Sequence, residues 1–158
     1  PENDVTLSDL ARLCDAFYIG GTKCGALFGE AVVFPRPGAV PHFFTMVKQQ
    51  GALLAKGRIL GLQFDTLFTG SLYREIGTRA LETAGRIRRA LLDRGYTLTI
   101  PSPTNQIFVT LDQEALERLS ARVEMSFWER LDESHTVMRI ATSWATSDED
   151  VDRLIGLL

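Results

Sequence analysis

The strongest structural signal in the sequence is a helical repeat of apolar side chains across residues 73–94, followed by a change to strand-like alternation. The apolar positions of this helix recur every three or four residues and are Ile76, Ala80, Ala84, Ile87 and Leu91. Gly95 is typical of the residue that ends a helix. Residues 106–111 then alternate, with Ile107, Val109 and Leu111 on one face. The sequence therefore predicts a long helix that leads into a half-buried sheet.

The other patterns predict an α/β chain in two parts. Composition changes near residues 70–73, so we expect one domain at residues 1–70, the end of a larger α/β domain, and a second at 71–158. The second is expected to be a small α+β domain with an antiparallel sheet. Expected strands are 16–19, 26–34, 96–100, 106–111, 125–131 and 136–142; expected helices are 8–14, 42–56, 59–68, 73–94, 112–122 and 146–158. Ser8 is expected to cap the first helix, and Thr146 with Glu149 the last.

Charge and composition exclude several classes of function. The 158 residues carry a formal net charge of −3, so the chain lacks the excess of positive charge that is typical of proteins that bind nucleic acid or an anionic membrane. No apolar run reaches the roughly 20 residues of a membrane helix. Two cysteines are too few for a disulfide scaffold, so a reducing cytoplasm is the simpler expectation. The histidines and cysteines lack metal-ligand spacing, and no metal is expected.

Lys23 is the main candidate for chemistry. It lies in the glycine-flanked segment GGTKCG at residues 20–25, between two apolar strands. Lysine normally avoids buried positions, but a buried lysine loses its proton more easily and becomes a nucleophile suited to Schiff-base formation. The alternative is a solvent-exposed lysine at a hairpin tip. Thr22 and the glycines could donate hydroxyl and backbone N–H groups to a phosphate.

Arg139 is the second candidate, because it lies in the largely apolar segment TVMRIAT at residues 136–142. An arginine in such a strand either extends from a sheet edge or binds a carboxylate with its forked guanidinium. Asn105, at the start of a strand, is either a turn residue or a ligand-orienting residue. Lys56 and Arg58 lie beside a helix end, where basic residues are usual; a phosphate contact is the other interpretation.

The segment AFYIGGTKCGALFGEAVVF at residues 16–34 resembles the cofactor-lysine region of threonine aldolases and related β-eliminating lyases, which depend on pyridoxal 5'-phosphate (PLP). Residues 48–64, KQQGALLAKGRILGLQF, are similar to the segment that follows in that family. TNQIFV at 104–109 and VMRIAT at 137–142 resemble two strands of its small domain. The resemblance extends in order through nearly the whole chain. It implies the end of a PLP-transferase large domain followed by the small C-terminal domain.

The resemblance also implies roles for individual residues. Lys23 would form the Schiff base with PLP, and Thr22 and Gly21 would lie near the cofactor phosphate. Arg58, or Lys56, would reach a phosphate across a dimer interface. Arg139 would hold the α-carboxylate of a small amino-acid substrate.

Asn105 is a further candidate for substrate binding. The implied reaction cleaves a β-hydroxy amino acid, such as threonine, to glycine and an aldehyde in a cytoplasmic homodimer or homotetramer.

Three alternatives remain open at this stage: β-elimination, transamination, and a non-catalytic dimerisation or binding module on the same scaffold. In that family, the N-terminal half of the protein supplies the aspartate that pairs with the pyridine nitrogen of PLP, the aromatic ring or histidine that stacks on the cofactor, and most of the phosphate-binding residues. None of those motifs occurs in these 158 residues. We therefore expect a C-terminal fragment that is inactive by itself.

Overall fold

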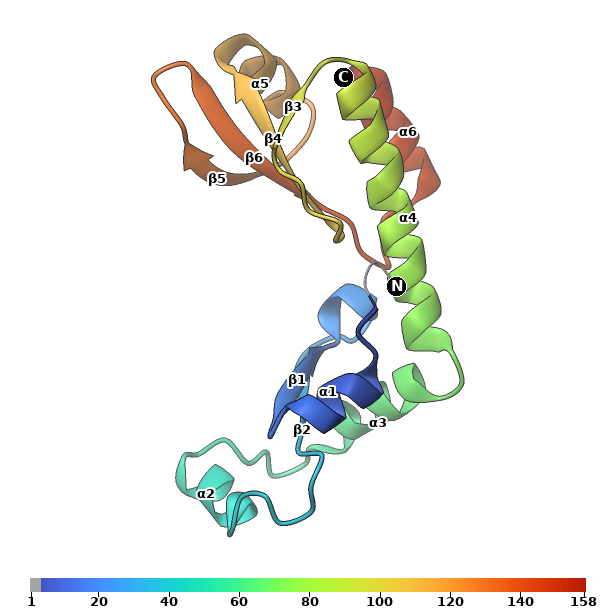
Figure 1. Cartoon of the computed structure of the whole chain (residues 1–158), viewed down its shortest axis with the longest axis vertical. Helices are drawn as coiled ribbons and strands as arrows, with labels where there is room; N and C mark the ends of the chain where they lie inside the picture. The colour runs from blue at the N-terminus through green and yellow to red at the C-terminus, as the bar shows by residue number, and fades with distance from the viewer. Residues whose placement is uncertain (1–3) are drawn as a thin grey trace. The chain divides into compact units, whose positions relative to one another are not determined.

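The computed structural model describes residues 4–158 and divides the chain into two compact units, with the boundary between Arg74 and Glu75. The predicted boundary lay four residues earlier, between residues 70 and 71. We call the parts unit 1 and unit 2 (Figure 1). The assignment of unit 1 to the end of a larger domain stays a prediction.

Unit 1 is built on a short antiparallel hairpin. Strand β1 (Phe17–Gly20) pairs with β2 (Glu30–Val33) in a register that runs from Phe17 opposite Val33 to Gly20 opposite Glu30. Its remaining elements are a 3-10 turn at Thr22–Cys24 and the helices α1 (Leu7–Leu13), α2 (Phe43–Gln49) and α3 (Arg58–Phe68).

Three local predictions for unit 1 were wrong in detail. Thr6, not Ser8, caps α1, because Thr6 and Asp9 satisfy each other's backbone N–H groups in a capping box. The second strand is shorter than the predicted 26–34, since Gly29 adopts φ +87°, a left-handed conformation outside the strand region. Helix α2 ends at Gln49 instead of continuing to residue 56, because the chain turns at Gly51 with φ +67°.

Unit 2 has a four-stranded antiparallel sheet in the order β3-β4-β6-β5. The long helix α4 begins at Leu72, three residues before the unit boundary, and enters unit 2 (Figure 1). From α4 onward, the elements of the chain are α4 (Leu72–Asp93), β3 (Thr97–Ile100), β4 (Gln106–Asp112), α5 (Gln113–Ser120), β5 (Ser126–Arg130), β6 (His135–Ala141) and α6 (Asp148–Leu157). Asp112 caps α5, as predicted, whereas α6 is capped by Ser147 with Asp150 rather than by Thr146 with Glu149.

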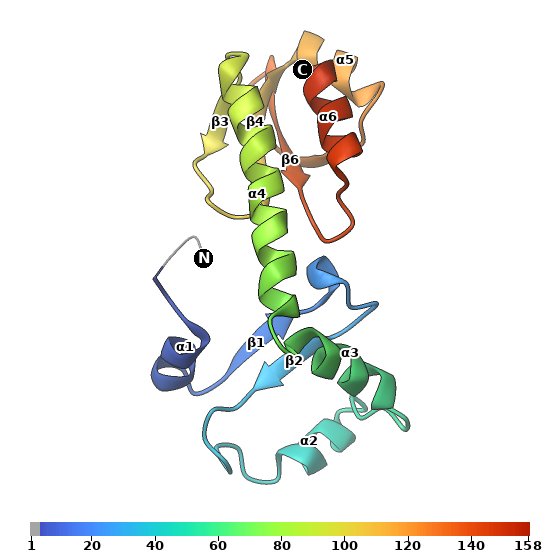
Figure 2. The ribbon, with the colours of Figure 1, turned by 90° about the vertical axis from the view of Figure 1, so that its right-hand side faces the viewer.

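One face of the unit 2 sheet packs on helices α4, α5 and α6 (Figure 2). Three residues of the predicted helical stripe (Ala84, Ile87 and Leu91) and the alternating strand residues form this core, because the two periodicities bring their side chains together. Its most deeply buried members include Ala84, Ile87, Leu91, Ile107, Val109 and Leu111. Ile76, at the start of the stripe, is only half-buried. Within residues 4–158, no helix combines the length and apolar composition that a membrane crossing requires.

An ion-pair network joins α4 to α6 on the surface of unit 2. Asp148 accepts from Arg86 at 2.6 Å and from Arg79 at 3.0 Å, and Arg86 also reaches Asp152 at 2.6 Å. The hydrogen bond and charge of Arg79, followed by those of Arg86, hold the pKa of Asp148 below its usual 3.8. Since the folded state prefers the ionised carboxylate, its stabilising contribution is present above the usual aspartate pKa and is lost as the pH falls through the lowered value.

Replacing Asp148 with asparagine is therefore expected to lower the thermal unfolding temperature modestly at pH 7 and by less as the pH falls below the usual aspartate value of 3.8. Circular dichroism melting curves between neutral and acidic pH measure this difference. Glu133→Gln is a matched control, because Glu133 lies in the exposed β5–β6 turn and makes no ion pair among the described residues. A constant difference between wild type and Asp148→Asn at every pH would contradict the assignment.

Candidate functional site

The segment at residues 20–25, which we call the lysine turn, is held around one backbone carbonyl. The Gly21 carbonyl accepts hydrogen bonds from the N–H groups of Cys24 at 2.9 Å and Ala26 at 3.0 Å. Gly25 closes the turn with φ +96°, a conformation that side-chain-bearing residues rarely adopt. The backbone around Lys23 is thus fixed by local sequence.

Helix α3 packs against the lysine turn and the residues that follow it. A Cβ atom added to Gly21 would lie 2.7 Å from the Cβ atom of Ala26 and 2.9 Å from Cζ of Phe64, so only glycine allows this approach. Gln63 of the same helix accepts a hydrogen bond from the Leu27 N–H at 2.5 Å. The described role of Gly21 is therefore close packing, and its predicted contact with a phosphate stays a prediction.

The Lys23 side chain is exposed, so the expectation of a shielded amine is wrong for the described residues. Thr22 and Lys23 of the 3-10 turn are both exposed, and within residues 20–25 only Gly21 is buried. No residue in the described part of the chain forms a hydrogen bond or an ion pair with the Lys23 amine. The amine is free to react, but residues 4–158 supply no cover for it.

The other predicted cofactor contacts in unit 1 are also exposed. Thr22 is the first residue of the 3-10 turn, and Arg58 is the first residue of α3. Neither side chain has a hydrogen-bond partner within the described residues, so both remain available to an anion. Their roles toward a phosphate stay predictions.

In unit 2, Arg139 lies on the sheet face opposite the helices. On β6 it is paired with Phe108 of β4 and Ser126 of β5, whereas its neighbour Met138 belongs to the core. The guanidinium carbon is 5.8 Å from the ring centre of Trp128, within cation–π range. Trp128 in turn meets Phe108 edge-on, with ring centres 4.8 Å apart.

The guanidinium of Arg139 is incompletely satisfied by the described residues. Nη1 makes one long hydrogen bond of 3.4 Å to Oε1 of Gln106. Nε is buried and has no hydrogen-bond partner among residues 4–158. Buried donors without partners are uncommon in folded proteins, because leaving one unpaired costs about 1–3 kcal/mol. A carboxylate that accepts from this side of the guanidinium would satisfy it.

Asn105 has a structural partner. Its side-chain amide donates to the Thr142 carbonyl at 2.6 Å, and the Thr142 N–H donates back to the Asn105 carbonyl at 3.0 Å. The buried Thr142 hydroxyl donates to the Ala80 carbonyl of α4 at 2.6 Å. Asn105 therefore ties the start of β4 to the end of β6, beside Gln106 and Arg139, and a role toward substrate stays a prediction.

The structure groups the predicted residues within each unit. Lys23, Thr22 and Gly21 share the lysine turn of unit 1, and Asn105 and Arg139 lie near Gln106 in unit 2. A common site formed by both groups stays a prediction. Sequence reasoning missed the residues that support them: Gln63, Phe64, Tyr73, Gln106 and Trp128. Only the register of β5 and β6 places Trp128 beside Arg139.

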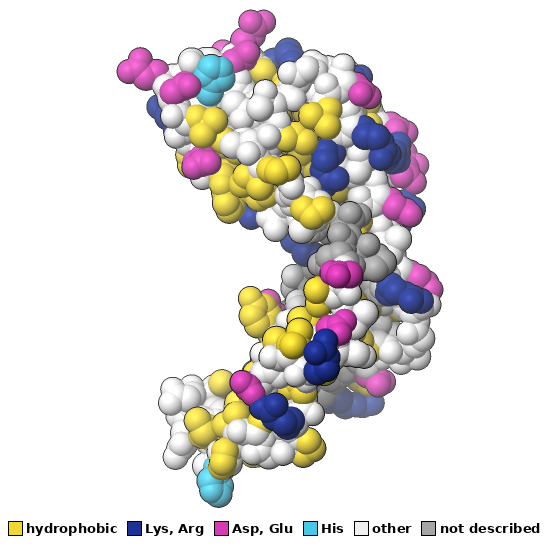
Figure 3. All heavy atoms as spheres, viewed as in Figure 1, with side chains coloured by type: hydrophobic (Ala, Val, Ile, Leu, Met, Phe, Trp, Pro, Cys, Tyr) yellow, Lys and Arg dark blue, Asp and Glu magenta, His cyan; other side chains and the backbone are white. Residues whose placement is uncertain are grey.

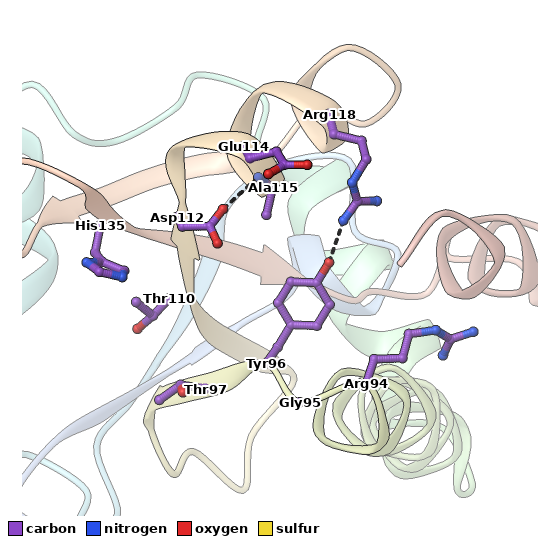
Figure 4. Close-up of a pocket in the computed structure, with 10 residues that line it drawn as sticks. All are labelled: Arg94, Gly95, Tyr96, Thr97, Thr110, Asp112, Glu114, Ala115, Arg118 and His135. Carbon is purple, nitrogen blue, oxygen red and sulfur yellow. Dashed lines mark hydrogen bonds between the residues drawn. The ribbon is translucent and has the colours of Figure 1, made fainter.

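A separate hollow of about 470 Å³ lies in unit 2 (Figure 4). Tyr96, Asp112, Arg118 and His135 are among its lining residues, and no predicted site residue is. Its main polar groups already have protein partners: Arg118 donates to the Tyr96 hydroxyl at 2.7 Å and to the Leu157 carbonyl at 2.6 Å, and Asp112 caps α5. We interpret it as a structural feature of the helix–sheet junction.

Comparisons of sequence and of structure both find similarity to threonine aldolases. In sequence, 145 residues are 31% identical to the low specificity L-threonine aldolase of Pseudomonas aeruginosa, covering 89% of this chain and 40% of that protein. In structure, the chain matches a threonine aldolase from Leishmania major with a TM-score of 0.94 and 38% identity, over 99% of this chain and 46% of that one. The chain is therefore similar to part of these threonine aldolases, over almost its whole length.

One further similarity to a solved structure concerns the fold alone. Serine palmitoyltransferase from Sphingomonas wittichii is 16% identical and matches with a TM-score of 0.62 over 90% of this chain. A second curated relative, the low specificity L-threonine aldolase of a Pseudomonas species, is 29% identical over 106 residues. No model of a protein family matches the chain. The chain spans less than half the length of the curated relatives it matches.

Proposed function

We propose that the protein is a PLP-dependent lyase that cleaves the Cα–Cβ bond of β-hydroxy amino acids, as in threonine to glycine and acetaldehyde. The observation that carries this proposal is the exposed amine of Lys23, which has no partner among residues 4–158, in a chain that is 38% identical to a threonine aldolase over 99% of its length. Attachment of an aldehyde requires an amine that the aldehyde can reach.

The residues present fit this cofactor. Lys23 would attach it, and Thr22 and the backbone at Gly21 would bind its phosphate. Arg58, or Lys56, would bind a phosphate across a dimer interface. The chemistry that PLP supplies when bound is an electron sink for the carbanion left at Cα. The exposed Lys23 still needs cover, which we propose comes from the portion of the family's proteins that this chain does not span.

Arg139 would orient the substrate. Its unpaired buried Nε is the described group that most clearly lacks an acceptor, and a substrate α-carboxylate supplies one. Trp128 and Gln106 limit the movement of the guanidinium from two sides. A carboxylate fixed in this way limits rotation about the bond to Cα, so that the bond to be broken keeps one orientation.

The expected assembly is a cytoplasmic homodimer or homotetramer that acts on a small amino acid. Large apolar side chains exposed on unit 1 support burial against further protein, among them Leu27, Phe44, Leu54 and Ile59 (Figure 3). Light scattering after size-exclusion chromatography measures the oligomeric state of the protein at its full natural length.

The test of the reaction uses the protein at its full natural length. We expect visible absorbance that borohydride removes, a PLP adduct on Lys23 in peptide mass spectra, and glycine release from threonine or allothreonine. Release of a 2-oxo acid instead would favour β-elimination or transamination. Absence of any Lys23-dependent chromophore would contradict the enzyme and favour a non-catalytic module.

A further inference from the structure

We infer that Tyr73 is a positioning residue for Lys23, because its hydroxyl binds the backbone at one end of the lysine turn and lies against Cys24 at the other. The inference rests on the proposed role of Lys23 as the attachment residue. Tyr73 lies in the first turn of α4 and belongs to unit 1, as does the whole lysine turn.

The first contact fixes the start of the turn. The Tyr73 hydroxyl donates to the Gly20 carbonyl at 3.0 Å, across 53 positions of sequence. Gly20 is the last residue of β1, directly before the segment that carries Lys23. The Tyr73 ring is itself held by stacking on Phe68 at the end of α3, with ring centres 4.8 Å apart and planes 17° apart. The ring that carries the donor is therefore in contact with a second aromatic side chain of unit 1.

The second contact is with Cys24, the residue that follows Lys23. Burial raises the pKa of the Cys24 thiol, and the hydrogen bond with Tyr73 lowers it in part. Burial also raises the pKa of the Tyr73 hydroxyl, and the charge and hydrogen bond of Cys24 add to this increase. Tyr73 thus contacts the turn on both sides of Lys23, and the Cys24 thiol is a natural reporter of the contact.

The substitution Tyr73→Phe removes the hydroxyl and keeps the ring that stacks on Phe68. Tyr18→Phe is the matched control, because Tyr18 is 71% exposed on β1 and its hydroxyl has no partner among the described residues. Both variants are made in the protein at its full natural length. We expect both to fold, since neither changes the packed volume.

The first measurement needs no cofactor. Alkylation of Cys24 by iodoacetamide is followed against pH by peptide mass spectrometry, with Cys14 as the internal reference. The thiolate is the reacting form, and the Tyr73 hydroxyl can donate its single proton to it in place of the Gly20 carbonyl, which lowers the Cys24 pKa. In Tyr73→Phe we therefore expect the Cys24 profile to move to higher pH, while Cys14 and the Tyr18→Phe protein stay unchanged.

The second measurement is the rate at which PLP becomes attached to Lys23, trapped with borohydride at timed intervals. Loss of one positioning hydrogen bond is expected to slow attachment about fivefold in Tyr73→Phe. Unchanged attachment overturns the positioning role and leaves the proposed function standing. Slower attachment with an unchanged Cys24 profile also overturns it, because the effect then arises away from the turn. Absence of any Lys23 adduct in the unaltered protein overturns both proposals.

Discussion

Replacing Lys23 with alanine is expected to eliminate the borohydride-stable PLP adduct and to lower the rate of threonine cleavage by roughly 10⁴-fold or more. Alanine has no nitrogen with which to bind an aldehyde. The fold is expected to be unaffected, because Lys23 is exposed and makes no hydrogen bond or ion pair within the described part of the chain. Peptide mass spectrometry, steady-state kinetics and thermal melting measure the three quantities.

Lys48→Ala is the control for this substitution, since Lys48 is an exposed lysine of α2 in the same unit. It is expected to retain the adduct on Lys23. If Lys23→Ala kept a stoichiometric adduct at another lysine together with normal cleavage, Lys23 would not be the attachment residue. If both variants lost activity equally, the loss would reflect lysine removal from this surface in general.

The sequence predicted the parts of the fold that depend on local periodicity. The stripe from Ala84 to Leu91 and the alternation from Ile107 to Leu111 form the core of unit 2, because each pattern determines which face of an element is apolar. Helix caps were harder to predict. Near α1, both Thr6 and Ser8 can cap a helix. Thr6 is the cap because Asp9 lies three residues after it and completes a capping box.

The environment of the candidate site depends on contacts between distant positions, which single-sequence patterns do not contain. Apolar strands on both sides of Lys23 suggested burial, but the intervening 3-10 turn leaves its side chain exposed. The hydrogen bond from Tyr73 to Gly20 joins the first turn of α4 to the end of β1. The two residues are 53 positions apart, and no local sequence pattern predicts their contact. Trp128 reaches Arg139 through a register shift between Phe127 and Glu129, which alternation alone would have missed.

Replacing Arg139 with lysine is expected to lower kcat/KM for threonine by about 100-fold, mainly through KM. Lysine keeps the positive charge and can remain over Trp128, but it loses the fork that binds both oxygens of a carboxylate. Attachment of PLP to Lys23 is expected to be unchanged. The unfolding temperature is not expected to fall, because the substitution also removes the buried Nε that lacks a partner among residues 4–158.

Two comparisons separate carboxylate binding from a general effect of the substitution. Arg130→Lys is the control variant, because Arg130 lies on β5 beside β6, is exposed, and forms no ion pair within the described residues. Spectral titrations of the PLP-loaded protein with alanine and with ethylamine compare ligands that differ by the carboxylate. Arg139→Lys should weaken alanine binding about 100-fold and leave ethylamine binding nearly unchanged, since only alanine offers the acceptor that the guanidinium lacks. Equal weakening of both ligands would show that Arg139 supports the site without contacting the carboxylate.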